Sequence, residues 1–563
     1  MKLRKKSGAI WLLAVLLFCS AAFWGFNRDE RNFEISKNLN IYYTLFRELN
    51  LFYVDEIDPG DLVKKSMDAM LTTLDPYTTY ISESEIEDFK LMTTGEYAGI
   101  GSLISKHKDE VIIAEPYEGF PAFKAGLKAG DVLLEINGTS VSKKSTDDVS
   151  SLLKGQPNVP LTIKIKRPGV DKIMEKKLVR ENIQLKSVPY YGMVSDSVGY
   201  ILLNQFTDKA SGEIKAALKE LKEQNAKSIV LDLRGNPGGL LDQAIEIVNL
   251  FVNKGEDIVS TKGKVSQWDK SYTATKTPFD AEIPIAVLVN RGSASASEIV
   301  SGAIQDLDRG VVIGERTFGK GLVQTTRNLT YNAKLKVTTA KYYIPSGRCI
   351  QALDYSHRNE DGSVGKIADS LITEFHTKNG RSVFDGGGVL PDLKIESERY
   401  SSLTINLIRN FMVFDYATLY ANSHDKIASS KEFKISDQEF EKFSQYIKEQ
   451  KFVYESESTE ILDALKKSAK EEKYFDISTN EFDALTAKLT PNLDRDLTRF
   501  KDEISDLLAH EIIKRYYYQN GGIEYSLKDD KTLLKAIEVL ENKTEYLGIL
   551  DGSIGLHALN KQK

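Results

Sequence analysis

Three serines alternate with alanines and precede a glutamate over residues 293–298, and Lys320 follows between two glycines. A serine hydroxyl can attack a carbonyl carbon when a nearby base takes its proton, and an unprotonated lysine amine is one such base. The glycines beside Lys320 let the backbone pass close to other groups, and an amine in a tight apolar setting can lose its proton near neutral pH. These residues are therefore candidates for acyl-transfer chemistry.

The serines are expected in the first turn of a helix. The apolar run 283–290 predicts a buried strand, residues 291–292 a turn, and 295–307 a helix. Unpaired backbone N–H groups and the helix dipole stabilise negative charge there, on an attacking alkoxide or an oxyanion. Serine is also a favoured N-cap residue, so the serines could instead be caps, and Lys320 could be a solvated loop lysine. These residues alone leave open which of Ser293, Ser295 and Ser297 would be the nucleophile and which would be caps.

No other pattern in the sequence indicates a second catalytic site. The six histidines lie in segments without catalytic character, although a Ser/His/Asp triad is not excluded by sequence distance. His510 begins a sequence similar to the zinc-binding pattern His-Glu-x-x-His, but Lys514 stands where the second histidine must be. We therefore expect no metal and no cofactor.

Several motifs together resemble the C-terminal processing peptidases, also called tail-specific proteases. The motifs are Ser-Ala-Ser-Ala-Ser-Glu at 293–298, Phe-Gly-Lys-Gly-Leu-Val-Gln at 318–324 and Asp-Leu-Arg-Gly-Asn-Pro-Gly-Gly at 232–239. The resemblance extends from about residue 40 to residue 395. It implies a serine endopeptidase with a Ser/Lys dyad, in which Ser295 is the nucleophile, Lys320 the base and Gln324 the residue that orients the lysine.

The same resemblance implies an oxyanion hole made of two backbone N–H groups. One is that of Ala296, directly after the nucleophile. The other belongs to Gly239 or its neighbour Gly238, in the glycine turn of the 232–239 motif. It also implies a multidomain α/β fold, with a crotonase/ClpP-like peptidase core and an inserted β-rich PDZ domain.

Residues 97–166 have the pattern typical of short strands separated by glycine turns, which indicates a separate β-rich module. Its first segment resembles the carboxylate-binding loop of PDZ domains, in which Gly99, Ile100 and Gly101 expose successive backbone N–H groups and the next strand pairs with a peptide. At the end of a later strand, Arg167 is the charged residue expected to report an occupied peptide site. The module is therefore predicted to bind the free C-termini of protein substrates.

The length of 563 residues predicts several domains. Along the rest of the chain, the pattern of expected helices and strands changes from one region to the next. Strands alternate with helices between 186 and 400, which favours an α/β domain, and the remainder is mostly helical. In residues 493–508 the apolar positions fit one helix face. The predicted parts are a signal peptide or membrane anchor (1–28), an N-terminal helical region (29–94), a PDZ domain (95–170), a peptidase core (171–400) and a C-terminal helical extension without an assigned role (401–563).

The N-terminus has the pattern of an export signal. Basic residues from Lys2 to Lys6 precede an apolar run from Ala9 to Phe26, and the small residues 20–22 would serve as a cleavage site. The run is between a cleavable signal and a membrane span in length, so both remain open. We expect a location in the periplasm or cell envelope, with inner-membrane association through the N-terminus and oligomerisation left open.

The net charge of -6 gives no electrostatic reason to expect binding to nucleic acid. The predicted function is that of an exported serine endopeptidase that cleaves proteins near their C-termini and selects them through a PDZ domain. The alternative is a catalytically inactive PDZ scaffold on a peptidase fold. A degenerate enzyme would be expected to lack Ser295, Lys320 or Gln324, and all three are present.

Overall fold

The computed structural model describes residues 32–554, which belong to two compact units, residues 1–80 and 81–563. Within 32–554 no helix has both the length and the apolar composition needed to cross a bilayer. The expected signal segment, residues 1–28, lies outside the described residues.

The first unit is helical up to β1 (Thr79–Ile81), where it ends. Residues 32–52 form one helix and α2 (Pro59–Thr72) the next. The Asp58 side chain caps α2 by accepting the N–H groups of Gly60 and Asp61, at 2.8 and 3.1 Å. Pro59 suits the first position because its missing N–H would be unpaired there anyway.

The expected PDZ domain, at the start of the second unit, is built on one sheet. Its strands follow the order β3-β4-β5-β7-β8, with β6 paired to β5, so β3 forms an edge. Alternate residues of β7 are buried because successive side chains point to opposite faces of a strand. The bounds are β3 (Ser102–His107), β4 (Glu110–Pro116), α4 (Pro121–Lys124), β5 (Val132–Ile136), β6 (Thr139–Ser140), α5 (Thr146–Leu153), β7 (Pro160–Lys166) and β8 (Met174–Val179).

The chain enters and leaves the PDZ domain through a two-stranded antiparallel ribbon. The short helices η1 (Glu83–Glu85) and α3 (Ile86–Thr94) precede β2 (Glu96–Gly99), which pairs with β9 (Glu181–Gln184). The domain is therefore an insertion, as the sequence predicted. Its sheet extends past residue 170, the expected end, because β8 pairs along the length of β7.

The expected peptidase core is a six-stranded sheet in the order β10-β11-β12-β15-β16-β23, in which only β10 is antiparallel. Parallel strands covered on both faces are expected to be continuously apolar, and all five residues of β15 are buried. The bounds are β10 (Tyr190–Met193), β11 (Val198–Leu202), β12 (Ser228–Asp232), β15 (Ile285–Val289), β16 (Val311–Gly314) and β23 (Leu393–Lys394).

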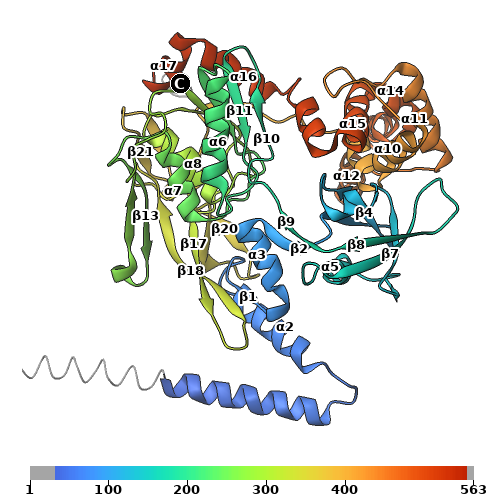
Figure 1. Cartoon of the computed structure of the whole chain (residues 1–563), viewed down its shortest axis with the longest axis horizontal. Helices are drawn as coiled ribbons and strands as arrows, with labels where there is room; N and C mark the ends of the chain where they lie inside the picture. The colour runs from blue at the N-terminus through green and yellow to red at the C-terminus, as the bar shows by residue number, and fades with distance from the viewer. Residues whose placement is uncertain (1–31, 555–563) are drawn as a thin grey trace, which may run out of the picture. The chain divides into compact units, whose positions relative to one another are not determined.

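Two sets of helices cover the faces of this sheet (Figure 1). The side chains of Ile229 and Leu231 in β12 pack with α6 (Ala210–Glu223), α7 (Leu241–Asn249) and α8 (Ala296–Asp306). The side chain between them, Val230, packs on the other face with α16 (Lys531–Glu541) and α17 (Lys543–Leu550). The last helices of the chain thus complete the peptidase core.

A second sheet and two small hairpins flank the core. In the second sheet, β18 pairs with β17 on one side and β13 on the other, and β14 pairs with β13. The bounds are β13 (Asp257–Gly263), η2 (Ser266–Trp268), β14 (Lys270–Thr273), β17 (Leu322–Asn328), β18 (Lys334–Tyr343), β19 (Leu353–Arg358), β20 (Val364–Lys366), η3 (Asp369–Leu371), β21 (Glu374–His376) and β22 (Ser382–Phe384).

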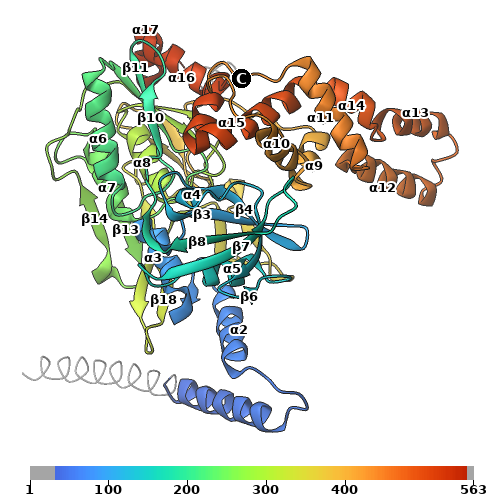
Figure 2. The ribbon, with the colours of Figure 1, turned by 45° about the vertical axis from the view of Figure 1, so that its right-hand side comes forward.

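The remaining helices form a group with its own apolar core, and in Figure 2 α12 and α13 lie side by side within it. The apolar face expected over 493–508 packs into this core, but it belongs to two helices that meet at Phe500. The bounds are α9 (Ser402–Arg409), α10 (Met412–Ser423), α11 (Asp437–Glu449), α12 (Glu457–Glu471), α13 (Thr479–Leu489), α14 (Leu493–Arg499) and α15 (Lys501–Ser526).

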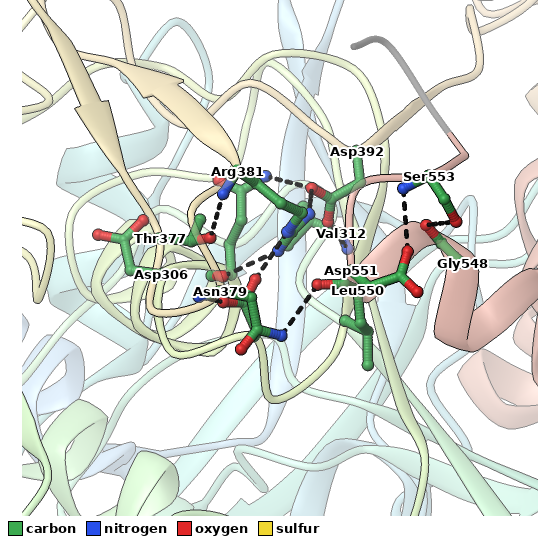
Figure 3. A network of polar contacts seen from close by, with 12 residues as sticks. Asp306, Val312, Thr377, Asn379, Arg381, Asp392, Gly548, Leu550, Asp551 and Ser553 are labelled. Atoms are coloured by element: carbon green, nitrogen blue, oxygen red, sulfur yellow. Dashed lines mark hydrogen bonds and ion pairs between the residues drawn. The ribbon is translucent and has the colours of Figure 1, made fainter. Parts of the chain in front are cut away.

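Buried charges anchor the C-terminal end of α8 (Figure 3). Arg381 donates to the Gln305 carbonyl in the last turn at 3.0 Å and pairs with Asp308 and Asp392. From the same loop, Asn379 donates to the Leu550 carbonyl at the end of α17, at 3.1 Å. Cations are favourable at the negative end of a helix dipole, so these contacts fix one end of α8. The other end of α8 carries the serines.

Candidate active site

Ser295 lies at the junction between β15 and α8, in a backbone conformation that is rare for a residue with a side chain. Its φ is 55° and its ψ is −113°, and α8 begins at the next residue. Such conformations cost free energy and persist where the surrounding structure imposes them, often at active sites. The turn holds Ser295 directly before the first N–H groups of a helix.

The structure distinguishes the three serines by their hydrogen bonds. Ser293 and Ser297 are fully buried and donate their hydroxyls to the carbonyls of Leu233 and Asn236, at 2.8 and 2.9 Å. These two serines therefore connect the 293–298 segment to the 232–239 loop. Ser295 is partly exposed and lines a cavity, which is the arrangement that a nucleophile requires.

One buried carboxylate connects the backbones of Ser295 and Lys320. An Oε atom of Glu298 accepts the N–H of Ser295 at 2.8 Å and that of Lys320 at 2.9 Å. The other oxygen accepts the Thr317 hydroxyl at 2.6 Å and the Gly319 N–H at 2.7 Å. Glu298 thus fixes the segment that carries the lysine against the start of α8.

A phenol makes a second connection between the same two residues. The Tyr342 hydroxyl lies 3.0 Å from the Ser295 carbonyl oxygen and 2.6 Å from that of Lys320.

Burial raises the pKa of Glu298 to about 7, although the four donors around it favour the charged form. Desolvation outweighs them because the carboxyl is fully buried.

A cavity of about 390 Å³ collects most of the sequence-predicted residues. Ser295, Lys320, Gln324, Gly239 and Ala296 all line it, with contributions from α3, the 237–241 segment, α8, β17 and β18. Residues from distant parts of the sequence therefore meet in one place. The remaining lining residues are Phe89, Met92, Thr93, Gln205, Pro237, Gly238, Leu240, Leu241, Ile299, Leu322, Val323, Thr326, Lys336 and Tyr342.

The glycine turn lies close against Ser295. A Cβ atom at Gly238 would be 2.8 Å from the Ser295 Cβ and 3.0 Å from the Ala296 nitrogen. The N–H of Gly238 donates to the Asn236 side chain at 2.9 Å, so of the two glycines Gly239 is the better candidate for the oxyanion donor. The N–H of Ala296 is at the first position of α8, where no intrahelical partner exists.

Gln324 lines the cavity on β17, and its side-chain amide donates to the Thr338 hydroxyl on β18 at 3.2 Å. This bond fixes the amide on the cavity side of the β17–β18 hairpin. The expected role of Gln324 in orienting Lys320 stays a prediction.

The expected peptide-binding residues lie in the PDZ domain, outside the set that lines the Ser295 cavity. Gly99 ends β2, Ile100 is buried, and Gly101 precedes the edge strand β3 with a φ of 71°. A Cβ at Gly101 would lie 2.3 Å from the Phe120 Cβ, so only glycine fits there.

Arg167 is occupied by a partner within the PDZ domain. Its guanidinium binds both carboxylate oxygens of Asp131, each at 2.7 Å, and the Gly126 carbonyl at 2.8 Å. Asp131 is fully buried, so Arg167 neutralises an otherwise unpaired buried charge. This contact was not predicted from the sequence.

Two residues of the site were missed at the level of the sequence. Glu298 was noted beside the serines, but its four contacts were not anticipated; a glutamate three residues after a helix-starting serine is the usual signal that its carboxylate turns back to the N-cap. Tyr342 carried no signal, since a tyrosine in a strand is ordinarily a packing residue.

Comparison with known proteins agrees with this geometry. Residues 197–356 match the model of peptidase family S41, residues 112–167 a PDZ domain, and residues 403–540 the "Probable PDZ-protease, C-terminal helical domain". The "Carboxy-terminal-processing protease" of Bartonella bacilliformis is 40% identical over 321 residues, which are 56% of this chain and 73% of that protein. The chain belongs to the carboxy-terminal-processing proteases of peptidase family S41.

A second relative supports the same family. A "Probable CtpA-like serine protease" of Staphylococcus aureus is 33% identical over 419 residues, 72% of this chain and 74% of that protein. Among solved structures, the photosystem II D1 C-terminal processing protease is 27% identical, with a TM-score of 0.35, over 63% of this chain and 92% of that one. Membership confirms a serine-type peptidase with a PDZ domain on a multidomain α/β fold.

Proposed function

We propose that this S41 peptidase is exported and cleaves protein substrates near their C-termini with a Ser295/Lys320 dyad. The supporting observation is that Ser295 and Lys320 line one cavity while Glu298 binds the backbone N–H groups of both. The other two serines donate their hydroxyls to backbone carbonyls.

In the proposed reaction, the Ser295 Oγ attacks the scissile carbonyl carbon and the Lys320 Nζ takes its proton. Negative charge develops on the carbonyl oxygen and is stabilised by the N–H groups of Gly239 and Ala296. The leaving amine takes the proton from Lys320 as the C–N bond breaks, which leaves an acyl-enzyme. A water molecule then loses a proton to Lys320 and attacks the ester carbonyl carbon. As the ester C–O bond breaks, the Ser295 Oγ takes this proton back from Lys320, while Gln324 holds the lysine side chain in place.

A fluorophosphonate probe that phosphonylates activated serines tests the dyad. We expect the wild-type protein to be labelled on Ser295 and to cleave an unstructured protein, and Ser295→Ala and Lys320→Ala to do neither while keeping their fold. Labelling at Ser293 or Ser297 would contradict the assignment. A folded wild-type protein that neither reacts nor cleaves would support the alternative, an inactive PDZ scaffold.

Substrate selection is proposed to use the loop Gly99-Ile100-Gly101 and the edge strand β3. The loop offers backbone N–H groups for a terminal carboxylate, and an edge strand can accept an added peptide strand. Arg167, at the end of β7, is proposed to transmit occupancy of this site through its bond to Asp131. The substrates would then be proteins with free C-termini.

Export is proposed from the basic and apolar N-terminal segment, residues 2–26. Such a segment would place the protein in the periplasm or cell envelope, cleaved free or anchored. Fusing residues 1–40 to a reporter enzyme that is active only after export tests this. Reporter activity equal to that of a leaderless fusion would contradict it.

A further inference from the structure

The catalytic cavity contains a second lysine to which the proposed reaction gives no role. Lys336 lines the cavity together with Lys320, and the lining includes no aspartate or glutamate. Much of the remaining lining is apolar, with Met92, Leu241 and Ile299 among the contributors. The cavity therefore presents two amines to a substrate and no carboxylate of its own.

The hairpin geometry directs Lys336 to the cavity. On β18, Lys336 and Thr338 share one face because alternate residues of a strand point the same way. On β17, Thr326 lies opposite Lys336 and Gln324 opposite Thr338. Gln324 and Thr326 line the cavity with Lys336, so this part of the hairpin forms one wall.

The charge of Lys336 is uncompensated within the described residues. Burial alone lowers the pKa of its amine, and no neighbouring carboxylate raises it again. A partly buried ammonium is costly unless an anion pairs with it. Exposed lysines on the same hairpin avoid this cost in water, as Lys341 does.

We propose that Lys336 forms an anion subsite of the catalytic cavity and binds a carboxylate of the substrate. The carboxylate is either an Asp or Glu side chain near the scissile bond or the free C-terminus of a short substrate. Binding would form a charge-assisted hydrogen bond in a partly dry setting, where such bonds are stronger than between neutral groups. The inference rests on the proposed function, since it assigns the cavity to the substrate.

Matched peptides test the subsite. One pair differs by Glu or Gln at each position around the scissile bond, and a second pair has a free acid or an amide at its C-terminus. In at least one pair, we expect the wild-type protein to cleave the peptide that carries the carboxylate with a kcat/KM about tenfold or more above that of its neutral partner. Lys336→Met should abolish that preference and keep cleavage of the neutral peptides, and Lys336→Arg should retain it.

Lys341→Met is the matched control, because Lys341 is exposed on the same strand and outside the cavity lining. The Glu/Gln pairs identify a side-chain carboxylate and the acid/amide pair a terminal one. An amide effect that persists in Lys336→Met belongs to the PDZ domain and not to this subsite.

Two outcomes would overturn the subsite. In the first, the Glu/Gln and acid/amide ratios of Lys336→Met equal those of the wild type. In the second, Lys336→Met and Lys336→Arg both lose cleavage of every peptide equally while remaining folded, which would make Lys336 part of the chemistry. Failure of the proposed function is separate, because it would appear as cleavage that survives Ser295→Ala or as a folded wild-type protein that cleaves no peptide.

Discussion

At Ser295 the chemistry depends on contacts that are made by other residues. The hydroxyls of Ser293 and Ser297 hold the 232–239 loop against the start of α8, and Glu298 holds the Lys320 segment there. In the proposed reaction, one serine of the motif reacts and the other two hold its surroundings in place. This explains the spacing of the motif, since the side chains at positions 293 and 297 are both buried.

Single alanine substitutions should separate these roles. Ser295→Ala should lower kcat by about 10⁴-fold or more with unchanged stability, because the dyad acts as a unit. Ser293→Ala should instead lower the free energy of unfolding by about 1–3 kcal/mol, since it removes the acceptor of the Asn290 N–H and one of the two donors to the Leu233 carbonyl. Peptide cleavage and chemical denaturation measure the two effects. If Ser293→Ala were the inactive variant and Ser295→Ala retained activity, the assignment of the nucleophile would be wrong.

Glu298 should make stability depend on pH in a defined window. Its pKa is raised to about 7 from an ordinary 4.5, so the folded protein holds this proton where the unfolded chain has lost it. The stabilisation is complete below about pH 4.5 and is lost as the pH rises through about 7. The thermal midpoint of Glu298→Gln should therefore rise relative to the wild type across that window.

The same substitution should lower kcat by about 10²-fold, because an amide cannot accept all four donors and the dyad loses its alignment. Glu441→Gln, at an exposed position, is the control and should show neither effect. A constant difference in midpoint between Glu298→Gln and the wild type from pH 4.5 to 7 would contradict the raised pKa.

Sequence motifs, through the resemblance that they carry, were enough to predict five of the residues that line the cavity. Ser295, Lys320 and Gln324 stand in contiguous motifs, so a resemblance can name them. Tyr342 and Lys336 could not be found this way, because their positions depend on how β18 pairs with β17. Arg167 was predicted to report an occupied peptide site, and its bond to Asp131 depends on a fold that brings residues 131 and 167 together.

At the scale of elements, α8 is the part that positions the proposed nucleophile. Its N-terminus carries Ser295, and every residue from Ala296 to Asp306 is buried. At its other end Arg348 and Asp306 form an ion pair with no exposed side-chain area, 2.8 Å apart. Both ends are thus fixed, which favours a preorganised site.

Arg348→Met tests this anchoring. The change leaves Asp306 buried without its partner, which costs about 3–5 kcal/mol. We expect faster amide hydrogen exchange along α8 by the corresponding factor, and a lower kcat with little change in KM. Arg409→Met, an exposed arginine on α9, is the control. Exchange rates in α8 that match the wild type would show that the ion pair does not hold the helix.

Element types were predicted better than their limits. The buried strand expected from the apolar run 283–290 and the short strands expected within 97–166 are all present. The continuous apolar face over 493–508 gave no sign of the break at Phe500, since both helices bury it in the same core. Apolar periodicity reports what is buried, and a change of helix direction preserves that pattern.

At the scale of the second unit, the C-terminal part of the chain contributes to two domains. Its last helices cover one face of the peptidase sheet, and Arg234 of the 232–239 motif pairs with Asp530 at the start of α16. Its helical group contacts the PDZ domain, where His107 of the edge strand pairs with Asp415 at 3.1 Å. This segment therefore links the PDZ domain to the peptidase core.

The bond between Arg167 and Asp131 decides how the PDZ domain can be tested. Arg167→Met alone should destabilise the domain by about 3–5 kcal/mol, because it leaves the buried Asp131 carboxylate without its positively charged partner. The double variant Arg167→Met/Asp131→Asn should restore most of that stability. If Arg167 transmits occupancy, the double variant still binds peptide but cleaves it more slowly. Full activity of a folded double variant would leave Arg167 a structural role only.

The PDZ domain should discriminate a free C-terminus from an amide on long substrates. A carboxylate held by backbone N–H groups gains charge-assisted hydrogen bonds that an amide lacks, so amidation should weaken binding to the Ser295→Ala protein about tenfold. It should slow cleavage by the wild type as well, if a bound C-terminus favours the active arrangement over the resting one. A terminus far from the scissile bond keeps this effect apart from the Lys336 subsite. Equal binding and equal cleavage of the two forms would reduce the PDZ domain to a passive tether.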